Sequence, residues 1–360
     1  MECEQESPSA SAAFFESLMA RAKEERLPIS ASFEVTSRCN LRCLHCYLGP
    51  PEGNSKTELN TAEACSIVDK IAEAGCLLLL FTGGEPLLRP DFEQVYRHAK
   101  ERGLVVRVFT NGTRVEDDVV QLFREYPPLE VEITLYGSTP EMYQEVTGSA
   151  NGYSRCLAGI HRLLKGGVRV KLKTVLMRPN HAGLPAMKAL ADRLGVPFRF
   201  DTVVFPMRDG DHGPLACRLS PEAAVVAETH FPTRPLAQQN APVRPPLSPP
   251  EREKLFLCGA GRTSFAVDPT GTMTPCLLMR RIEYDLLHGT FVEGWRRMEA
   301  VCEMKVGVDF PCKTCPESVL CLRCPAIFEQ ETGNVEQPPD WLCDLARRRR
   351  ETSAKQKEPL

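Results

Sequence analysis

Short apolar segments alternate with amphipathic ones over residues 31–204, and this alternation limits the possible folds more than any other feature. Six segments have the length and the β-branched or aromatic content of buried strands: 31–35, 77–82, 105–110, 130–136, 170–177 and 198–204. Between them, residues 60–75, 91–102, 116–125, 153–166 and 185–194 have helical spacing. Six β/α repeats in series predict right-handed crossovers and a parallel sheet, curled into a partial (β/α)6 barrel of the TIM type. In such α/β folds, the loops that follow the strands build the active site.

The composition is that of a globular protein with no evident affinity for nucleic acid or membranes. The 360 residues are 42% hydrophobic and 25% charged, and the formal net charge is −3, which provides no basic surface for either partner. The amino terminus lacks a secretory signal, and the longest purely apolar run, residues 76–81, is too short to span a bilayer. We therefore expect a cytoplasmic protein with reduced thiols. Its sixteen cysteines then need an explanation other than disulfides.

The sequence also predicts successive regions of different character. An amino-terminal extension (1–30) precedes the barrel core (31–230), and a linker (231–250) contains seven prolines, as is typical of an extended segment. A small cysteine-rich domain at 251–345 follows. The chain then ends in a polar tail (346–360), whose four consecutive arginines we interpret as a solvated terminus.

Three cysteines lie on the loop after the first predicted strand, in the pattern C-x3-C-x2-C: Cys39, Cys43 and Cys46. A thiolate cluster on a short loop indicates zinc or iron–sulfur. A structural zinc site uses four protein ligands, usually in paired knuckles, and only His45 is near enough in sequence to add one. Three thiolates can instead hold three irons of a four-iron cluster and leave the fourth iron open.

This loop and the segments after the next strands resemble the signature of the radical S-adenosylmethionine (radical SAM) enzymes. CNLRCLHCY is similar to the family's C-x3-C-x-aromatic-C pattern, with His45 at the aromatic position. The second strand leads into FTGGEPLL, which contains the family's GGEP motif, and the third leads into TNGT, which resembles another cofactor-facing turn. The order of these segments carries the resemblance, which covers about residues 31–204.

The resemblance implies a [4Fe-4S] cluster on Cys39, Cys43 and Cys46, with S-adenosylmethionine at its open iron. An electron from a reductant such as flavodoxin or ferredoxin would cleave S-adenosylmethionine to methionine and a 5′-deoxyadenosyl radical, which abstracts hydrogen from the substrate. Glycines would let the backbone approach the ligand, and the glutamate of GGEP would accept from the methionine ammonium. The implied cofactor contacts are Gly83, Gly84, Glu85, Asn111 and Thr134.

A second group of cysteines spans residues 258–343 and exceeds what one metal ion can use. From the residues alone, two zinc ions are possible. Beside the upstream motifs, the pattern resembles a SPASM domain, which carries two auxiliary [4Fe-4S] clusters. The resemblance implies that Cys258, Cys276 and Cys324 hold the first cluster, and that Cys312, Cys315, Cys321 and Cys343 hold the second.

Two features of this second group depart from the commonest SPASM pattern. Two residues, rather than three, separate Cys321 from Cys324. The stretch before Cys258 also contains no cysteine, so an eighth ligand is missing. The first auxiliary cluster therefore has an open iron, or it takes Cys217, Cys302 or another side chain as its fourth ligand.

Three kinds of substrate remain open. A ribosomally made peptide, joined by a thioether or carbon–carbon crosslink, is the commonest task implied by the SPASM resemblance. A sulfatase oxidised to formylglycine is an alternative, although those relatives place an acidic residue where this chain has Leu277. A tetrapyrrole of haem-type biosynthesis is another. About thirty residues precede the first strand, so for a peptide substrate we expect a separate leader-binding protein as partner.

The sequence nominates no catalytic acid or base. Glu132, Tyr136, Lys173 and Asp201 lie on strands that could face the barrel interior, but alternation alone does not say which of them do.

Overall fold

The computed structural model describes residues 9–49, 57–231 and 247–355. Most of the predicted linker (232–246), the first eight residues and the last five lie outside this part of the chain. Six strands follow one another in the barrel: β1 (Ser30–Thr36), β2 (Leu78–Gly83), β3 (Val105–Thr110), β4 (Glu130–Thr134), β5 (Val170–Val175) and β6 (Phe198–Asp201). The helices between them are α2 (Thr61–Glu73), α3 (Phe92–Glu101), α4 (Asp117–Glu125), α5 (Pro140–Thr147), α6 (Gly152–Lys165) and α7 (Leu184–Arg193).

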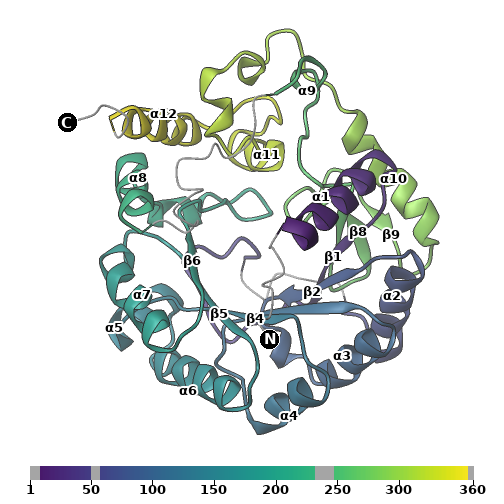
Figure 1. Cartoon of the computed structure of the whole chain (residues 1–360), viewed down its shortest axis with the longest axis vertical. Coiled ribbons are helices and arrows are strands. Elements are labelled where there is room, and N and C mark those ends of the chain that lie inside the picture. Colours follow the sequence, from purple (N-terminus) through teal and green to yellow (C-terminus); the bar gives the residue numbers. More distant parts are fainter. Residues whose placement is uncertain (1–8, 50–56, 232–246, 356–360) are drawn as a thin grey trace, which may run out of the picture.

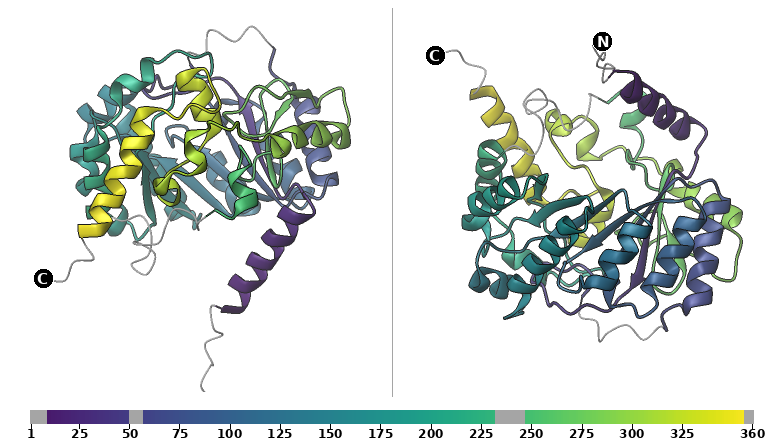
Figure 2. Two further views of the ribbon diagram at one scale, coloured as in Figure 1. Left: turned by 90° about the horizontal axis from the view of Figure 1, so that it is seen from above. Right: turned by 60° about the horizontal axis from the view of Figure 1, so that its bottom comes forward.

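The strands form a parallel sheet in the order β6-β5-β4-β3-β2-β1, and this confirms the predicted α/β partial barrel. Figures 1 and 2 show the sheet curving, with the helices on its outer side. Side chains along the strands accordingly alternate between the two faces of the sheet. Val131 and Ile133 of β4 and Leu172 of β5 join the main apolar core beneath the helices, whereas the intervening residues lie on the opposite, inner face. Helix α5 was not predicted, because its eight residues fall directly after a strand and before another helix.

The cysteine-rich region continues the same sheet. Strand β7 (Ser264–Val267) pairs in parallel with β1, and β8 (Thr272–Thr274) and β9 (Tyr284–Asp285) follow antiparallel. Phe265 and Val267 of β7 belong to the same apolar core as the barrel strands. The pairing with β1 fixes the cysteine-rich region against the barrel.

The remaining helices lie at the ends of the described chain and in the carboxy-terminal region. They are α1 (Ser9–Glu24), α8 (Pro221–His230), α9 (Pro249–Arg252), α10 (Phe291–Glu303), α11 (Pro325–Thr332) and α12 (Asp340–Lys355). The stretch expected as a polar tail is thus helical up to Lys355. Helix α12 lies beside α8 (Figure 1), where Arg349 pairs with Glu228 at 2.7 Å. None of the described helices is both long and apolar enough to cross a membrane.

Candidate functional site

The cysteine loop, residues 37–49, follows β1 at the carboxyl edge of the sheet. Because the strands are parallel, β2 and β3 deliver the GGEP segment and the 111–113 turn to the same edge. The GGEP backbone is hydrogen-bonded to the start of the loop. The N–H of Gly84 donates to the carbonyl of Thr36 at 2.9 Å, and the N–H of Glu85 donates to the carbonyl of Arg38 at 2.8 Å. The segments that the sequence singled out therefore meet at one place.

The two glycines of GGEP are required by this close approach. A Cβ atom on Gly83, whose φ is +130°, would lie 2.3 Å from the carbonyl oxygen of Thr36. A Cβ atom on Gly84 would lie 2.3 Å from the carbonyl oxygen of Arg38. The resemblance to radical SAM enzymes implies that these glycines allow close approach of a ligand. In the structure, the atoms that exclude a side chain belong to the cysteine loop.

Replacing Gly84 with alanine is therefore expected to lower the free energy of unfolding by about 3 kcal/mol, because the loop backbone must move and two hydrogen bonds weaken. Denaturant unfolding measures the change. Gly103→Ala is the matched control, since no atom of the described residues lies within 4 Å of its Cβ position and its positive φ alone carries a cost, about 1 kcal/mol. Equal losses in the two variants would contradict the requirement for close approach at Gly84.

Glu85 is fully buried and connects the second strand to the third. Its carboxylate accepts from the hydroxyl of Thr110 at 2.7 Å, the N–H of Asn111 at 2.7 Å and the N–H of Leu87 at 3.1 Å. Burial raises the pKa of Glu85 above its ordinary value, and these hydrogen bonds oppose that rise. The side chain thus holds the turn after β3 in place. Contact with a methionine ammonium stays a prediction.

Asn111 reaches from that turn to the cysteine loop. Its amide donates to Oδ1 of Asn40 at 3.0 Å and lies 4.0 Å from Sγ of Cys39. Its own Oδ1 accepts from Oγ1 of Thr113 at 2.6 Å, and Asn40 donates to the same hydroxyl at 2.8 Å. Asn111 is thereby fixed beside Cys39. Neither Asn40 nor Thr113 was nominated from the sequence, since only their contacts across the fold reveal their role.

The three thiols of the loop lie near one another. Burial, together with Glu85 and Cys46, raises the pKa of Cys39 to about 11, and burial with both neighbouring thiols raises that of Cys43 further. The ring of His45 contacts that of Tyr136 at 5.5 Å. Its buried Nδ1 has no hydrogen-bond partner among the described residues, and burial lowers the pKa of His45 to about 4.

The carboxy-terminal thiols form two groups. Burial, and then the nearby thiols of Cys276 and Cys258, raise the pKa of Cys324 to about 12. Burial, and then its neighbours, likewise raise the pKa of Cys312 to about 12; these neighbours are Cys321, Cys343 and Cys315. Cys324 thus lies near Cys258 and Cys276, and the other four thiols lie near one another. The assignment of one cluster to each group, which the SPASM resemblance implies, stays a prediction.

Cys217 and Cys302 were the cysteines considered as an eighth ligand. Cys217 is buried with Met177 and donates to the carbonyl of Pro214 at 3.0 Å. Cys302, on α10, lies 4.0 Å from the carbonyl of Ala260, which is two residues beyond Cys258. Cys302 therefore lies near the backbone that follows Cys258, and the eighth ligand stays a prediction.

The donor set fits iron–sulfur clusters. All the cysteines of the three groups are free thiols, and soft thiolates are the ligands of such clusters. Within the described ranges, no three His, Cys, Asp or Glu side chains converge closely enough for a single metal ion.

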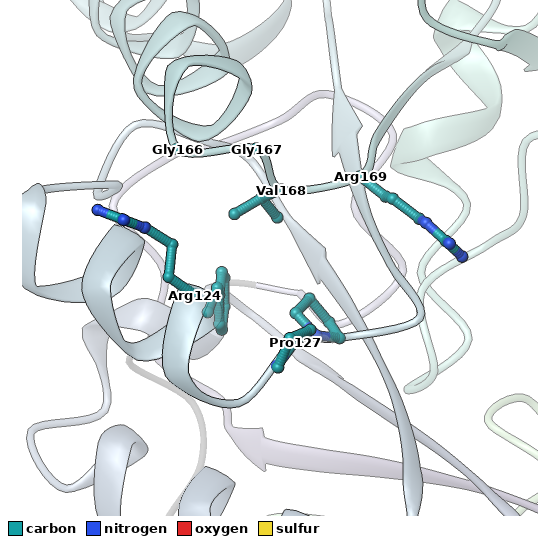
Figure 3. Close-up of a pocket in the computed structure, with 8 residues that line it drawn as sticks. Arg124, Pro127, Gly166, Gly167, Val168 and Arg169 are labelled. Carbon is teal, nitrogen blue, oxygen red and sulfur yellow. The ribbon is translucent and has the colours of Figure 1, made fainter.

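The four residues considered as a catalytic acid or base lie in two different places in the structure. Glu132, Lys173 and Asp201 lie on the inner face of the sheet, whereas Tyr136 packs behind the cysteine loop against His45. Thr134, the last residue of β4, is opposite Lys173 in the strand register. A hollow of about 430 Å³ lies at the other, amino-terminal ends of β4 and β5, between Arg124 and Arg169 (Figure 3). This hollow is therefore at the opposite edge of the sheet from the cysteine loop, the GGEP segment and the 111–113 turn.

Comparison with known proteins assigns the family. Residues 33–184 match the model of the radical SAM superfamily. Residues 33–184 therefore form a radical SAM domain. Such a domain uses S-adenosylmethionine and one [4Fe-4S] cluster, and the assignment of Cys39, Cys43 and Cys46 as the cluster ligands stays a prediction.

Two curated relatives have different activities. The chain is 29% identical over 165 residues to the Fe-coproporphyrin III synthase of Methanosarcina barkeri. This match covers 46% of this chain and 41% of the synthase. It is 28% identical over 263 residues to the mycofactocin maturase MftC of Mycobacterium ulcerans, covering 69% of this chain and 68% of the relative. The match to the synthase thus spans less than half of that relative's length.

The fold extends beyond the matched family region. The structure of Streptococcus suis SuiB bound to its precursor peptide SuiA is similar over 95% of this chain and 82% of that one, with a TM-score of 0.69 and 12% identity. At this identity the likeness concerns the fold, and it includes the cysteine-rich region.

Proposed function

We propose that this radical SAM enzyme abstracts hydrogen from a ribosomally made peptide and matures it by a thioether or carbon–carbon crosslink. The observation that carries the proposal is the grouping of thiols: three on the cysteine loop and two further groups in the cysteine-rich region. Similarity to the mycofactocin maturase extends over 69% of the chain, whereas similarity to the coproporphyrin enzyme extends over 46%.

In this proposal, Cys39, Cys43 and Cys46 hold the cluster. When bound and reduced, it supplies the electron that cleaves S-adenosylmethionine to methionine and a 5′-deoxyadenosyl radical, which takes hydrogen from the substrate. The chain provides position and exclusion of water. Glu85 fixes the turn that carries Asn111 beside Cys39, and the burial of these groups keeps competing protons away.

The two carboxy-terminal thiol groups would hold auxiliary [4Fe-4S] clusters, as in a SPASM domain. One would use Cys258, Cys276 and Cys324, and Cys302 is available near the first of them. A flavodoxin or ferredoxin would supply the electron, in a reducing compartment such as the cytoplasm. The separate leader-binding protein stays a prediction.

The test is formation of 5′-deoxyadenosine by the full chain, reconstituted with iron and sulfide without oxygen and supplied with dithionite and S-adenosylmethionine. Expected products are 5′-deoxyadenosine and methionine in equal amounts, with faster turnover when precursor peptides encoded nearby are added. Absence of 5′-deoxyadenosine from a chain that carries its iron would contradict the proposal.

A tetrapyrrole substrate is the second candidate, favoured by the match to the coproporphyrin enzyme. The same assay discriminates, because 5′-deoxyadenosine formation accelerated by a coproporphyrin and not by peptides would replace the peptide assignment. Formylglycine formation is less favoured, since Leu277 follows Cys276 where those relatives have an acidic residue.

A further inference from the structure

The inner face of the sheet carries a compact group of charges on β4, β5 and β6. Glu132 of β4 lies in register with Lys171 of β5, and Lys173 lies in register with Arg199 of β6. Asp201 follows on the same face of β6. Residues that alternate with these belong to the apolar cores beneath the helices. The group therefore lies on the face of the sheet opposite these cores. Figures 1 and 2 show that the sheet curves with the helices on its outer side, so this face is the concave one.

Two carboxylates in this group serve three cations. Glu132 accepts from Arg199 at 2.8 Å and from Lys171 at 3.3 Å, and Asp201 accepts from Arg199 at 2.7 Å. Burial opposes ionisation of Glu132, but Lys173 and the other cations outweigh it and lower the pKa of Glu132. With both acids ionised and all three bases charged, one positive charge is left over.

We assign the unbalanced positive charge to Lys173, which has the fewest partners among the three basic side chains of the group. The nearest carboxylate oxygen to Nζ of Lys173, on Glu132, is 3.8 Å away, which is beyond a hydrogen bond. The amine lies 3.0 Å from the ring centre of Phe109, and its side chain is only 15% exposed. Burial lowers the pKa of Lys173 to about 7, although Glu132 acts in the opposite direction. A largely buried ammonium group that has no hydrogen-bond acceptor among the described residues is costly unless a ligand provides one.

We propose that Lys173, supported by Lys171 and Arg199, binds a carboxylate group of the substrate on the inner face of the sheet. This assignment rests on the proposed function, under which the substrate enters the barrel. One carboxylate matches the single unbalanced charge, whereas a doubly charged phosphate exceeds it. Because Lys173 is opposite Thr134 at the carboxyl end of β4, the bound group would lie near the edge that carries the cysteine loop.

The test uses propionate as the probe, since a peptide carboxylate and a tetrapyrrole propionate share its chemistry, and propionamide as the neutral control. The full chain is labelled with ¹³C at lysine Cε, and the Lys173 signal is assigned by its loss in K173R. Propionate is expected to raise the pH midpoint of that signal by about one unit or more, while propionamide leaves it unchanged. An unchanged midpoint with saturating propionate would overturn the proposal.

Variants provide a second measurement. Propionate affinity is expected to fall about tenfold or more in K173M, because a charge-assisted hydrogen bond is lost. It should not change in K188M, which removes a lysine from the outer surface of α7, where it pairs with Asp192. Equal affinity in K173M and the unmodified chain would refute the site.

A final arm separates the substrate carboxylate from that of S-adenosylmethionine. Binding of propionate and S-adenosylmethionine at the same time supports the proposal, and mutually exclusive binding overturns it. Failure of the proposed function is recognised separately, because it appears as absence of 5′-deoxyadenosine in the unmodified chain, whereas the propionate measurements need no turnover.

Discussion

Replacing Cys43 with alanine is expected to lower the rate of 5′-deoxyadenosine formation by about a thousandfold or more, since the cluster that supplies the electron loses one of its three thiolates. Cys43 lies between the other two thiols of the loop, and burial with both of them raises its pKa. Chromatography of the nucleoside products measures the rate.

Cys65 on α2 provides the matched control. It is a free thiol outside the three groups, so Cys65→Ala should retain activity. Full activity in C43A, or an equal loss in C65A, would contradict the assignment of the cluster to the loop.

Replacing Glu34 with glutamine is expected to lower the free energy of unfolding by about 3–5 kcal/mol, because two guanidinium groups lose their shared counter-charge. Glu34 of β1 is 1% exposed. It accepts from Arg208 at 2.6 and 2.8 Å and from Arg280 at 3.3 Å. Arg208 also acts electrostatically on the thiols of Cys46 and Cys276. The ion pairs of Glu34 with Arg208 and Arg280 thus connect the cysteine loop, the barrel and the cysteine-rich region.

Urea unfolding of the full chain measures this loss. The control is Glu25→Gln, which removes an exposed carboxylate paired with Arg21 one helical turn away and should leave the free energy of unfolding almost unchanged. A loss in E34Q as small as that in E25Q would show that the buried ion pair contributes little.

The repeats of the barrel could be predicted from sequence because local pattern determines them. Each strand alternates between the apolar core and the inner face or is apolar throughout, and each is followed by a helix with its own apolar stripe. The resemblance to radical SAM enzymes identified the cysteine loop, the GGEP segment and the 111–113 turn. Their meeting at one place follows from the fold, since parallel strands deliver consecutive loops to one edge.

Contacts between distant residues were not predictable in this way. Strand β7 has four residues, and nothing local indicates that it pairs with β1. The two arginine partners of Glu34 lie 174 and 246 residues further along the chain. The pairing of Glu132 with Arg199 depends on the register of three strands. Alternation of Lys171 and Lys173 around Leu172 was the available signal for the charged inner face, and only the register unites it with Arg199.

The measurement that tests the central claim most directly is the number of iron and zinc atoms bound per chain after anaerobic reconstitution. Three four-iron clusters, on the loop and on the two carboxy-terminal groups, predict about twelve irons and no stoichiometric zinc. A count of about four irons would agree with a radical SAM cluster alone and would contradict the assignment of auxiliary clusters to the carboxy-terminal thiols. Stoichiometric zinc with little iron would contradict the assignment of these thiols to iron–sulfur chemistry.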